Sequence, residues 1–144
     1  MEDDQPFPEY AALAAAFGTA LAGFLVVAGR RLPERISLSD TVRIGLASYK
    51  IGRLIAKDRV TSFVRAPVTE DAAATEPKRE GGARALGELV TCPHCIGLWA
   101  ASGFAYSLVL FPRQTRLVTT IFGGQAVADF LNAAFVRLHD GQSA

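Results

Sequence analysis

Residues 10–29 read YAALAAAFGTALAGFLVVAG, a run of 20 residues without a charged side chain. A helix rises about 1.5 Å per residue, so this run is about 30 Å long, which is the thickness of the hydrocarbon core of a bilayer. Residues 89–112 form a second run without formal charge if His94 is neutral, and residues 117–136 form a third with one charge, Asp129. These runs predict an all-α, small integral membrane protein with three transmembrane helices.

The composition agrees with this interpretation. Of the 144 residues, 50% are apolar and 20% are charged, and the formal net charge is +1. Soluble domains carry about 25% charged residues and spread them so that each helix has a polar face. Here the segment 30–88 alone holds 12 Lys/Arg and 8 Asp/Glu. The small net charge argues against a general nucleic-acid binder, so no nucleic-acid partner is expected.

The charges that flank the first run predict an orientation. An acidic tail, residues 1–9, precedes this run, and Arg30, Arg31 and Arg35 follow it. Basic residues next to a membrane helix favour the cytoplasmic side. Three spans would then place the N-terminus outside and the C-terminal tail, residues 137–144, in the cytoplasm. We expect a multi-pass protein of the cell (inner) membrane.

The charged segment after the first run divides into two parts. Residues 38–66 predict a basic amphipathic helical segment, with Ser39 or Asp40 as a plausible N-cap, and residues 67–88 predict a flexible linker. The helix either lies in the membrane interface, with its basic side chains on anionic lipid headgroups, or packs on the other helices with its charges solvated. The candidate interface residues are Arg43, Lys50, Arg53, Lys57, Asp58, Arg65 and Pro67.

Small residues recur at four-residue intervals in the first two runs. Lipid tails supply no hydrophobic force between helices, so small residues that let two backbones approach mark contact faces. The candidate packing positions are Gly18, Gly97, Ala101 and Gly103. The other helix belongs either to the same chain or to another one, so besides lipid we expect a homo-oligomer or another membrane protein as partner.

Cys92-Pro93-His94-Cys95 opens the second run. The spacing is that of half a zinc site and also that of a redox dithiol. A structural zinc ion needs four ligands, so a site with Cys92, His94 and Cys95 would need a second copy of the chain. The thioredoxin βαβ context is missing, and cytoplasmic thiols stay reduced. A purely structural role is the third alternative. We predict no cofactor, with zinc possible only in an oligomer.

Gln125, Asp129 and Asn132 line one side of the third run, at positions i, i+4 and i+7. A carboxylate inside a membrane helix costs at least about 2.5 kcal/mol on insertion scales, so we expect Asp129 to face the interior of the bundle. There it either keeps its proton and donates a hydrogen bond, or it belongs to an ion or proton path. We expect it near the cysteine motif.

Three sequence blocks carry a family resemblance: ASYKIGRLI at 47–55, DRVTSFVRAP at 58–67 and GELVTCPHCIGLW at 87–99. In this order they resemble the DUF1360 family, small bacterial and phage membrane proteins of unknown function. The resemblance covers residues 38–136 and leaves out the acidic N-terminus. It implies that these blocks form the functional surface, and it implies no reaction.

These observations lead to one main expectation for function and two alternatives. We expect a non-enzymatic multi-pass membrane protein that acts as an oligomeric scaffold or partner-binding module at the cytoplasmic membrane face. The first alternative is a membrane-embedded thiol or metal site built on the cysteine pair. The second is a holin-like phage lysis protein, which the long charged segment 30–88 fits poorly.

Overall fold

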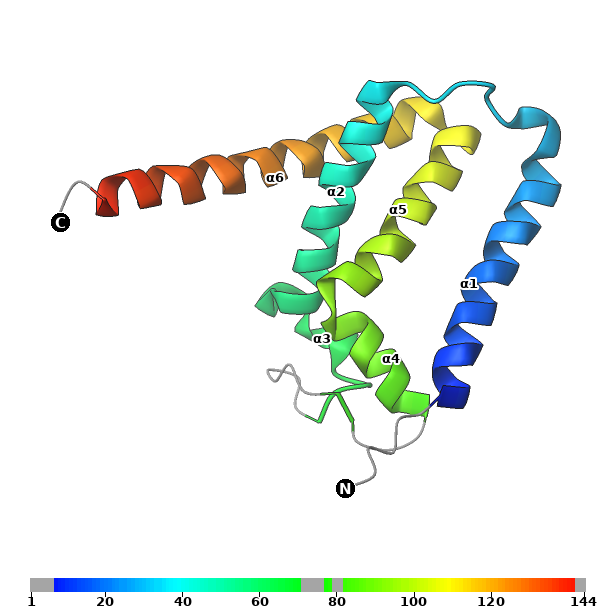
Figure 1. The fold of residues 1–144 in the computed structure, drawn as a ribbon, viewed down its shortest axis with the longest axis horizontal. Coiled ribbons are helices and arrows are strands. Elements are labelled where there is room, and N and C mark those ends of the chain that lie inside the picture. The colour runs from blue at the N-terminus through cyan, green and yellow to red at the C-terminus, as the bar shows by residue number, and fades with distance from the viewer. Residues whose placement is uncertain (1–6, 71–76, 79–81, 142–144) are drawn as a thin grey trace.

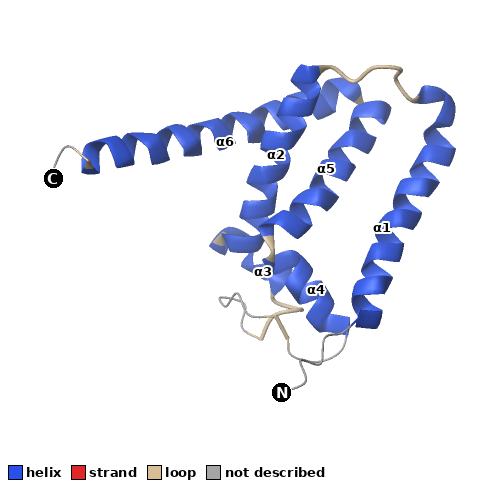
Figure 2. Cartoon of the chain, in the orientation of Figure 1, coloured by secondary structure: helices blue, strands red, loops and turns tan. Residues whose placement is uncertain are grey.

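The computed structural model describes residues 7–70, 77–78 and 82–141 (Figure 1). Its elements are α1 (Phe7–Ala28), a 3-10 turn (Gly29–Arg31), α2 (Leu38–Lys57), a second 3-10 turn (Arg59–Thr61), α3 (Ser62–Arg65), α4 (Gly82–Thr91), α5 (Pro93–Leu110) and α6 (Pro112–Asp140). Within the described ranges there is no strand, only an isolated bridge between Thr69 and Pro77 (Figure 2). The all-α prediction is confirmed.

Parts of three predicted segments lie outside the described residues. These are most of the acidic tail (1–6), the middle of the predicted linker (71–76 and 79–81) and the end of the C-terminal tail (142–144). Where the rest of the linker is described, it contains a helix: α4 begins at Gly82 and continues to Thr91.

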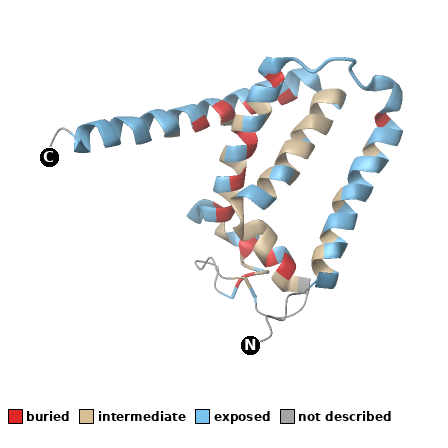
Figure 3. Ribbon diagram, in the orientation of Figure 1, coloured by how far each residue is buried: buried red, intermediate tan, exposed pale blue. Residues whose placement is uncertain are grey.

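α2 is the central element of the structure. It packs against both α5 and α6, whereas α1 contacts mainly α4 and α5. Figure 1 shows α1, α2 and α5 side by side, with α6 leaving the upper end of the bundle and pointing away from α1. Buried residues gather along α2 and the first half of α6, while α1 and the far half of α6 are largely exposed (Figure 3).

The backbones of α2 and α5 touch at Gly52. A Cβ at this position would lie 2.5 Å from the carbonyl oxygen of Pro93 and 3.4 Å from the Cα of Gly97. Because 2.5 Å is closer than a carbon and a carbonyl oxygen can approach, only glycine fits there. Ala47 and Ala56, on the same helix, are fully buried as well. Small residues therefore set the distance between these two helices.

α1 and α5 run in the same direction. Two aromatic contacts pair them in ascending order, Phe17 with Trp99 and Phe24 with Tyr106. A third contact continues the order below them, where Tyr10 meets Glu88 of α4, just before α5. The predicted path of three alternating spans, in which residues 38–66 connect the first two spans without crossing the membrane, would make these two helices antiparallel. The structure corrects this path, because α2 packs within the bundle and returns the chain from the end of α1 to the start of α5.

One helix in the described part of the chain is long and apolar enough to cross a membrane. It is Phe7–Arg31, 25 residues with a mean hydropathy of 2.1 in its most apolar stretch. Three such helices were predicted. The third predicted span lies in α6, whose polar residues Gln125, Asp129 and Asn132 lower its mean hydropathy.

Two prolines explain why the second predicted span is shorter in the structure. The region 89–112 divides at Cys92, which has an extended backbone with φ −94° and ψ 110°. A residue before proline avoids the helical region, so Pro93 ends α4 and begins the 18-residue α5. Pro112 likewise separates α5 from α6, a helix of 29 residues that extends beyond 117–136 at both ends.

The N-cap of α2 is Ser37, and not Ser39 or Asp40. Its side chain accepts a hydrogen bond of 3.1 Å from the backbone N–H of Asp40, which lies in the first turn. At the other end the helix stops at Asp58, where the backbone becomes extended, and the predicted segment 38–66 continues as a 3-10 turn and α3.

Candidate functional site

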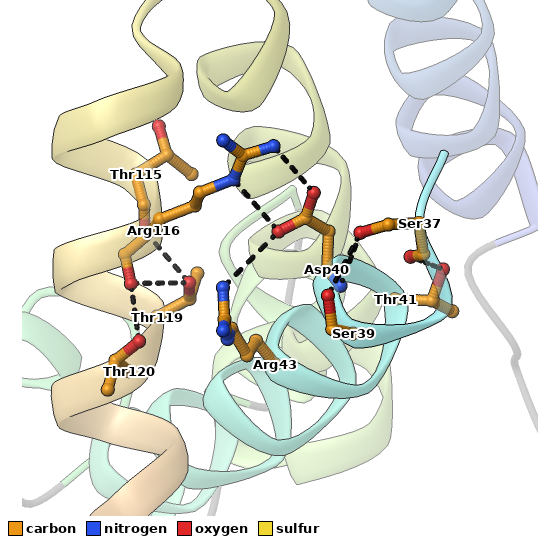
Figure 4. Close-up of polar contacts among 9 residues, drawn as sticks. All are labelled: Ser37, Ser39, Asp40, Thr41, Arg43, Thr115, Arg116, Thr119 and Thr120. Atoms are coloured by element: carbon orange, nitrogen blue, oxygen red, sulfur yellow. Dashed lines mark hydrogen bonds and ion pairs between the residues drawn. The ribbon is translucent and has the colours of Figure 1, made fainter. Parts of the chain in front are cut away.

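Asp40 is a buried carboxylate of α2 that forms an ion pair with the half-exposed Arg116 of α6 (Figure 4). Arg116 donates two hydrogen bonds to it, from Nε to Oδ1 at 3.1 Å and from Nη2 to Oδ2 at 2.9 Å. Arg43 Nη1 lies 3.5 Å from the same Oδ1. This bidentate contact joins the start of α6 to the start of α2. Sequence reasoning missed it, although an acid in the first turn of an amphipathic helix and Arg116 before the third run were both visible.

The face of α6 that meets α2 is built from small residues. Thr115, Thr119, Gly123 and Ala126 are its buried positions. Thr119 donates its hydroxyl proton to the carbonyl of Thr115 at 2.8 Å, so burial leaves this hydroxyl satisfied. A Cβ at Gly123 would lie 3.5 Å from the Cβ of Leu46, an ordinary contact distance. This face lets α6 approach α2 closely.

Asp129 is paired with Lys50 of α2. The Lys50 Nζ donates to Oδ2 at 2.6 Å, and the Gln125 side chain donates to Oδ1 at 3.2 Å. The sequence suggested two states for Asp129, a protonated carboxyl and a member of an ion or proton path. The ion pair with Lys50 is a third arrangement that it did not suggest. Asn132 is exposed and is not part of this group.

An open cavity of about 700 Å³ lies between α2 and the middle of α6. Its lining includes Tyr49, Lys50, Arg53, Asp58, Asp129 and Arg137. Tyr49 stacks on Phe130 with ring centroids 5.2 Å apart, and the Arg53 guanidinium lies 5.9 Å from the Tyr49 ring centroid. Three cationic side chains and two carboxylates line this cavity, so most of its positive charge is offset.

A second cavity, of about 460 Å³, lies between α2 and the start of α5. Its lining includes Ser48, Tyr49, Arg53, Lys57, Pro93 and His94. Arg53 and Tyr49 line both cavities and so separate them. Two cations and no carboxylate belong to the lining of this second cavity, which makes it favourable for anionic groups.

The cysteine pair lies at the start of α5. The Cys92 Sγ accepts a hydrogen bond of 3.3 Å from the backbone N–H of Cys95, and the two Sγ atoms are 2.7 Å apart. The hydrogen bond from the Cys95 thiol, with further bonds from the N–H groups of Cys95 and His94 and the charge of Lys57, lowers the pKa of the Cys92 thiol. Both thiols are free.

The described residues hold no group of three His, Cys, Asp or Glu side chains that could bind a metal ion. Cys92 and Cys95 offer two sulfur ligands. His94, between them in sequence, is exposed and lines the second cavity together with Arg53 and Lys57. Within this part of the chain the residues fit half of a zinc site and no more.

Arg65 closes the C-terminal end of α2. It is only 2% exposed, and its Nη1 donates to the carbonyl of Ile55, to that of Asp58 at 3.1 Å and to the Thr61 hydroxyl at 3.3 Å. The last carbonyls of a helix have no partner within the helix, so this buried guanidinium satisfies them. This inward position could not be predicted from the sequence, because a basic residue two positions before Pro67 resembled a surface charge.

The other candidate interface residues occupy different environments. Arg43 lies beside Asp40 on the same helix, whereas Lys50 pairs with Asp129 and so joins α2 to α6. Lys57 and Asp58, at the end of α2, and Pro67, after α3, are exposed. The structure therefore does not gather the seven candidates on one surface.

The four candidate packing positions also differ. Gly97 lies against α2, where a Cβ would be 3.8 Å from the carbonyl oxygen of Ser48. At Gly18 and Gly103 a Cβ would meet no heavy atom within 4 Å. Ala101 is half-buried in α5. Only the Gly97 position lies in a close backbone contact.

Glu88 connects α4 to the start of α1. It accepts a hydrogen bond from the Tyr10 hydroxyl, and Arg84 Nε lies 3.0 Å from its Oε1. The bond from Tyr10, followed by the bond and charge of Arg84, lowers the pKa of the Glu88 carboxyl. The start of α1 and the cysteine pair therefore lie at the same end of the bundle.

Comparison with known proteins gives a family and one curated relative. The family model described as "Protein of unknown function (DUF1360)" matches residues 44–135, from α2 through most of α6. The UPF0713 protein YngL of Bacillus subtilis (strain 168) is 26% identical over 115 residues, which cover 74% of this chain and 88% of the relative. No solved structure matches the chain. The chain belongs to the DUF1360 family of proteins of unknown function.

Proposed function

We propose that the protein is a multi-pass helical membrane protein that acts as a non-enzymatic scaffold and self-associates through α6. The apolar surface that the bundle leaves uncovered carries this proposal. α1 has one buried residue, Ala28. Val26 and Val27 are 83% and 85% exposed. Apolar surface of this extent occurs where lipid or another protein covers it.

The path of the chain supports a bilayer crossing by α1, α2 and α5. α1 and α5 run in the same direction, so if both cross, the chain has to return between them, and α2 is the element that returns. A helix of 20 residues is about 30 Å long, which suffices. Charges inside a membrane need partners. In α2, Asp40 has Arg116 and Lys50 has Asp129.

The arginines at one end of the bundle support an outside N-terminus. Arg31 and Arg35, after α1, line the same hollow as Arg116 at the start of α6. Basic residues in short connections favour the cytoplasmic side of a membrane. With this end in the cytoplasm, the start of α1 and the cysteine pair lie on the outer side of the cell membrane.

The far half of α6 supports self-association. No residue from 127 to 140 is buried, and this half carries exposed apolar side chains such as Leu131. Gly124, Ala128 and Asn132 are spaced four residues apart and are all exposed. Small residues at this interval admit a second helix, and an asparagine can hydrogen-bond across such a contact. The occupant that we propose is α6 of a second copy.

The test compares two Ala→Leu substitutions in α6 of the full chain. Ala128→Leu fills the proposed contact, whereas Ala134→Leu lies six residues further on, about 120° around the helix. In mild detergent, light scattering should give an oligomer for the parent and for Ala134→Leu, and a monomer for Ala128→Leu. A monomeric parent, or an equal response of the two variants, would contradict the proposal.

A further inference from the structure

Two thiols lie close together at the accessible start of α5. Cys92 is the N-cap, and Pro93 begins the helix, so the backbone turns sharply between the two cysteines. This turn brings the Sγ atoms of Cys92 and Cys95 to 2.7 Å from each other. An S–S bond is about 2.05 Å long, so small side-chain rotations suffice to form one.

The two thiols differ in their surroundings. Cys92 is half-buried and accepts hydrogen bonds from the thiol and the backbone N–H of Cys95. Donors of this kind stabilise a thiolate, which is the reactive form. Cys95 is exposed and is held against the sulfur of Cys92. Cys92 is therefore placed to attack, and Cys95 is placed to displace whatever has become attached to Cys92.

The second cavity adjoins the residues between the two thiols. Pro93 and His94 form part of its wall, and Arg53 and Lys57 of α2 supply cations to the same space of about 460 Å³. A molecule whose sulfur reaches Cys92 can thus place acidic groups beside Arg53 and Lys57. Oppositely charged groups at such a site raise the encounter rate and select among substrates.

From this juxtaposition we infer that Cys92 and Cys95 are a thiol–disulfide exchange site, and that Arg53 and Lys57 select disulfides that carry carboxylate groups. This inference goes beyond the scaffold role proposed above and does not rest on it. It applies to one copy of the chain and needs no metal ion.

The reaction balances without a further reagent. The Cys92 thiolate attacks one sulfur of the disulfide, a Cys92–sulfur bond forms, the disulfide bond breaks, and the leaving thiolate takes up a proton from water. Cys95 releases its proton to water and attacks the Cys92 sulfur, which frees the second leaving thiolate. The cysteine pair loses two electrons and becomes a disulfide, and the substrate disulfide gains them as two thiols.

The first experiment uses the full chain in detergent micelles and oxidised glutathione, an acidic peptide disulfide. Intact mass after acid quench should show that the parent loses both thiol hydrogens and retains no glutathione. Cys95→Ser should stop with glutathione attached to Cys92, and Cys92→Ser should react about tenfold more slowly. Circular dichroism confirms that each variant is helical. A parent that stays reduced, or that accumulates glutathione adducts, overturns the inference.

The second experiment tests the role of the cations. Cystamine is a disulfide with amino groups in place of carboxylates, and each rate is divided by the rate of the same disulfide with N-acetylcysteine. The parent should prefer oxidised glutathione about tenfold, and Arg53→Gln with Lys57→Gln should lose this preference. Arg30→Gln with Arg31→Gln, far from the thiols, serves as the control. A parent without preference, or a double variant that retains it, overturns the selection by Arg53 and Lys57.

Discussion

The two sides of α5 are built in different ways. Towards α2, the backbones touch at Gly52 and Gly97, and α6 adds ion pairs to the same helix. Towards α1, the main contacts are two aromatic pairs, Phe17 with Trp99 and Phe24 with Tyr106. The family match begins at residue 44, within α2, so it covers most of the first side and leaves out α1. The helices around α2 form a core of their own. Most of α1 is exposed, so its stability depends on the lipid or protein that we propose around it.

The largest effect is expected on the α2 side, at Gly52. Gly52→Ala places a Cβ 2.5 Å from the Pro93 carbonyl oxygen, so the two helices must separate. We expect a loss of about 3 kcal/mol in the free energy of unfolding. Thermal unfolding in detergent, followed by circular dichroism, measures it.

Gly18→Ala is the matched control on the α1 side. Nothing lies within 4 Å of a Cβ there, and alanine favours helix over glycine by about 1 kcal/mol. This variant should be unchanged or slightly more stable. If Gly52→Ala were as stable as Gly18→Ala, the close contact between α2 and α5 would not exist.

Arg65→Met should give the second-largest effect. The variant keeps the length of the side chain but removes the guanidinium that donates to the carbonyls of Ile55 and Asp58. Hydrogen bonds to a charged group contribute about 1.5–3 kcal/mol, so we expect a loss of about 2 kcal/mol. Arg59→Met, at an exposed position of the preceding 3-10 turn, should cost almost nothing. Equal stability of the two variants would contradict the buried, hydrogen-bonded position of the Arg65 side chain.

Asp40→Asn should have a smaller effect, because the partner Arg116 is half exposed. The variant loses the charge of a bidentate pair but keeps its shape, and we expect a loss of about 1–2 kcal/mol in the free energy of unfolding. A double-mutant cycle with Arg116→Gln measures the coupling between the two side chains. Additive effects of the two substitutions would refute the direct contact between Asp40 and Arg116.

The smallest effect is expected at the contact between α1 and α4. Tyr10→Phe removes one hydrogen bond to Glu88, for less than about 1 kcal/mol. Because this bond lowers the pKa of Glu88, its contribution is complete above the ordinary glutamate value of about 4.3 and is lost as the pH falls through the lowered pKa. The difference in stability between parent and variant should therefore shrink on acidification. A difference that grows at low pH would contradict the assignment.

The sequence predicted the helices more accurately than it predicted their arrangement in space. Runs without charge are local features, so the all-α class and the helical parts of 10–29 and 117–136 could be read from them. The direction of α5 relative to α1 could not, because it depends on whether α2 packs inside or outside the bundle. The basic residues of α2 suggested the membrane interface as well as packing, and nothing local in the sequence showed Asp129 as the partner of Lys50.

The candidate site was predicted in part for the same reason. The cysteine pair is a four-residue motif and was visible at once, as was the small residue Gly97. The buried Arg65 and the pair of Asp40 with Arg116 join residues whose contacts depend on tertiary structure. A buried charge finds its partner only after the fold brings the two elements together, so spacing along the chain does not reveal it.

The parallel course of α1 and α5, with α2 returning between them, is the central claim, and cross-linking of two introduced thiols tests it most directly. Tyr10→Cys and Glu88→Cys are introduced together into the full chain with Cys92→Ser and Cys95→Ser, and native membranes are treated with a short bis-maleimide. The structure predicts an intramolecular cross-link for this pair, because the ends of the native Tyr10 and Glu88 side chains are in contact and the reagent spans the gap that the shorter cysteine side chains leave. The control pair, Gly29→Cys with Glu88→Cys, should not cross-link, because α1 separates these positions by about 30 Å. A cross-link in the control pair and none between positions 10 and 88 would contradict the claim.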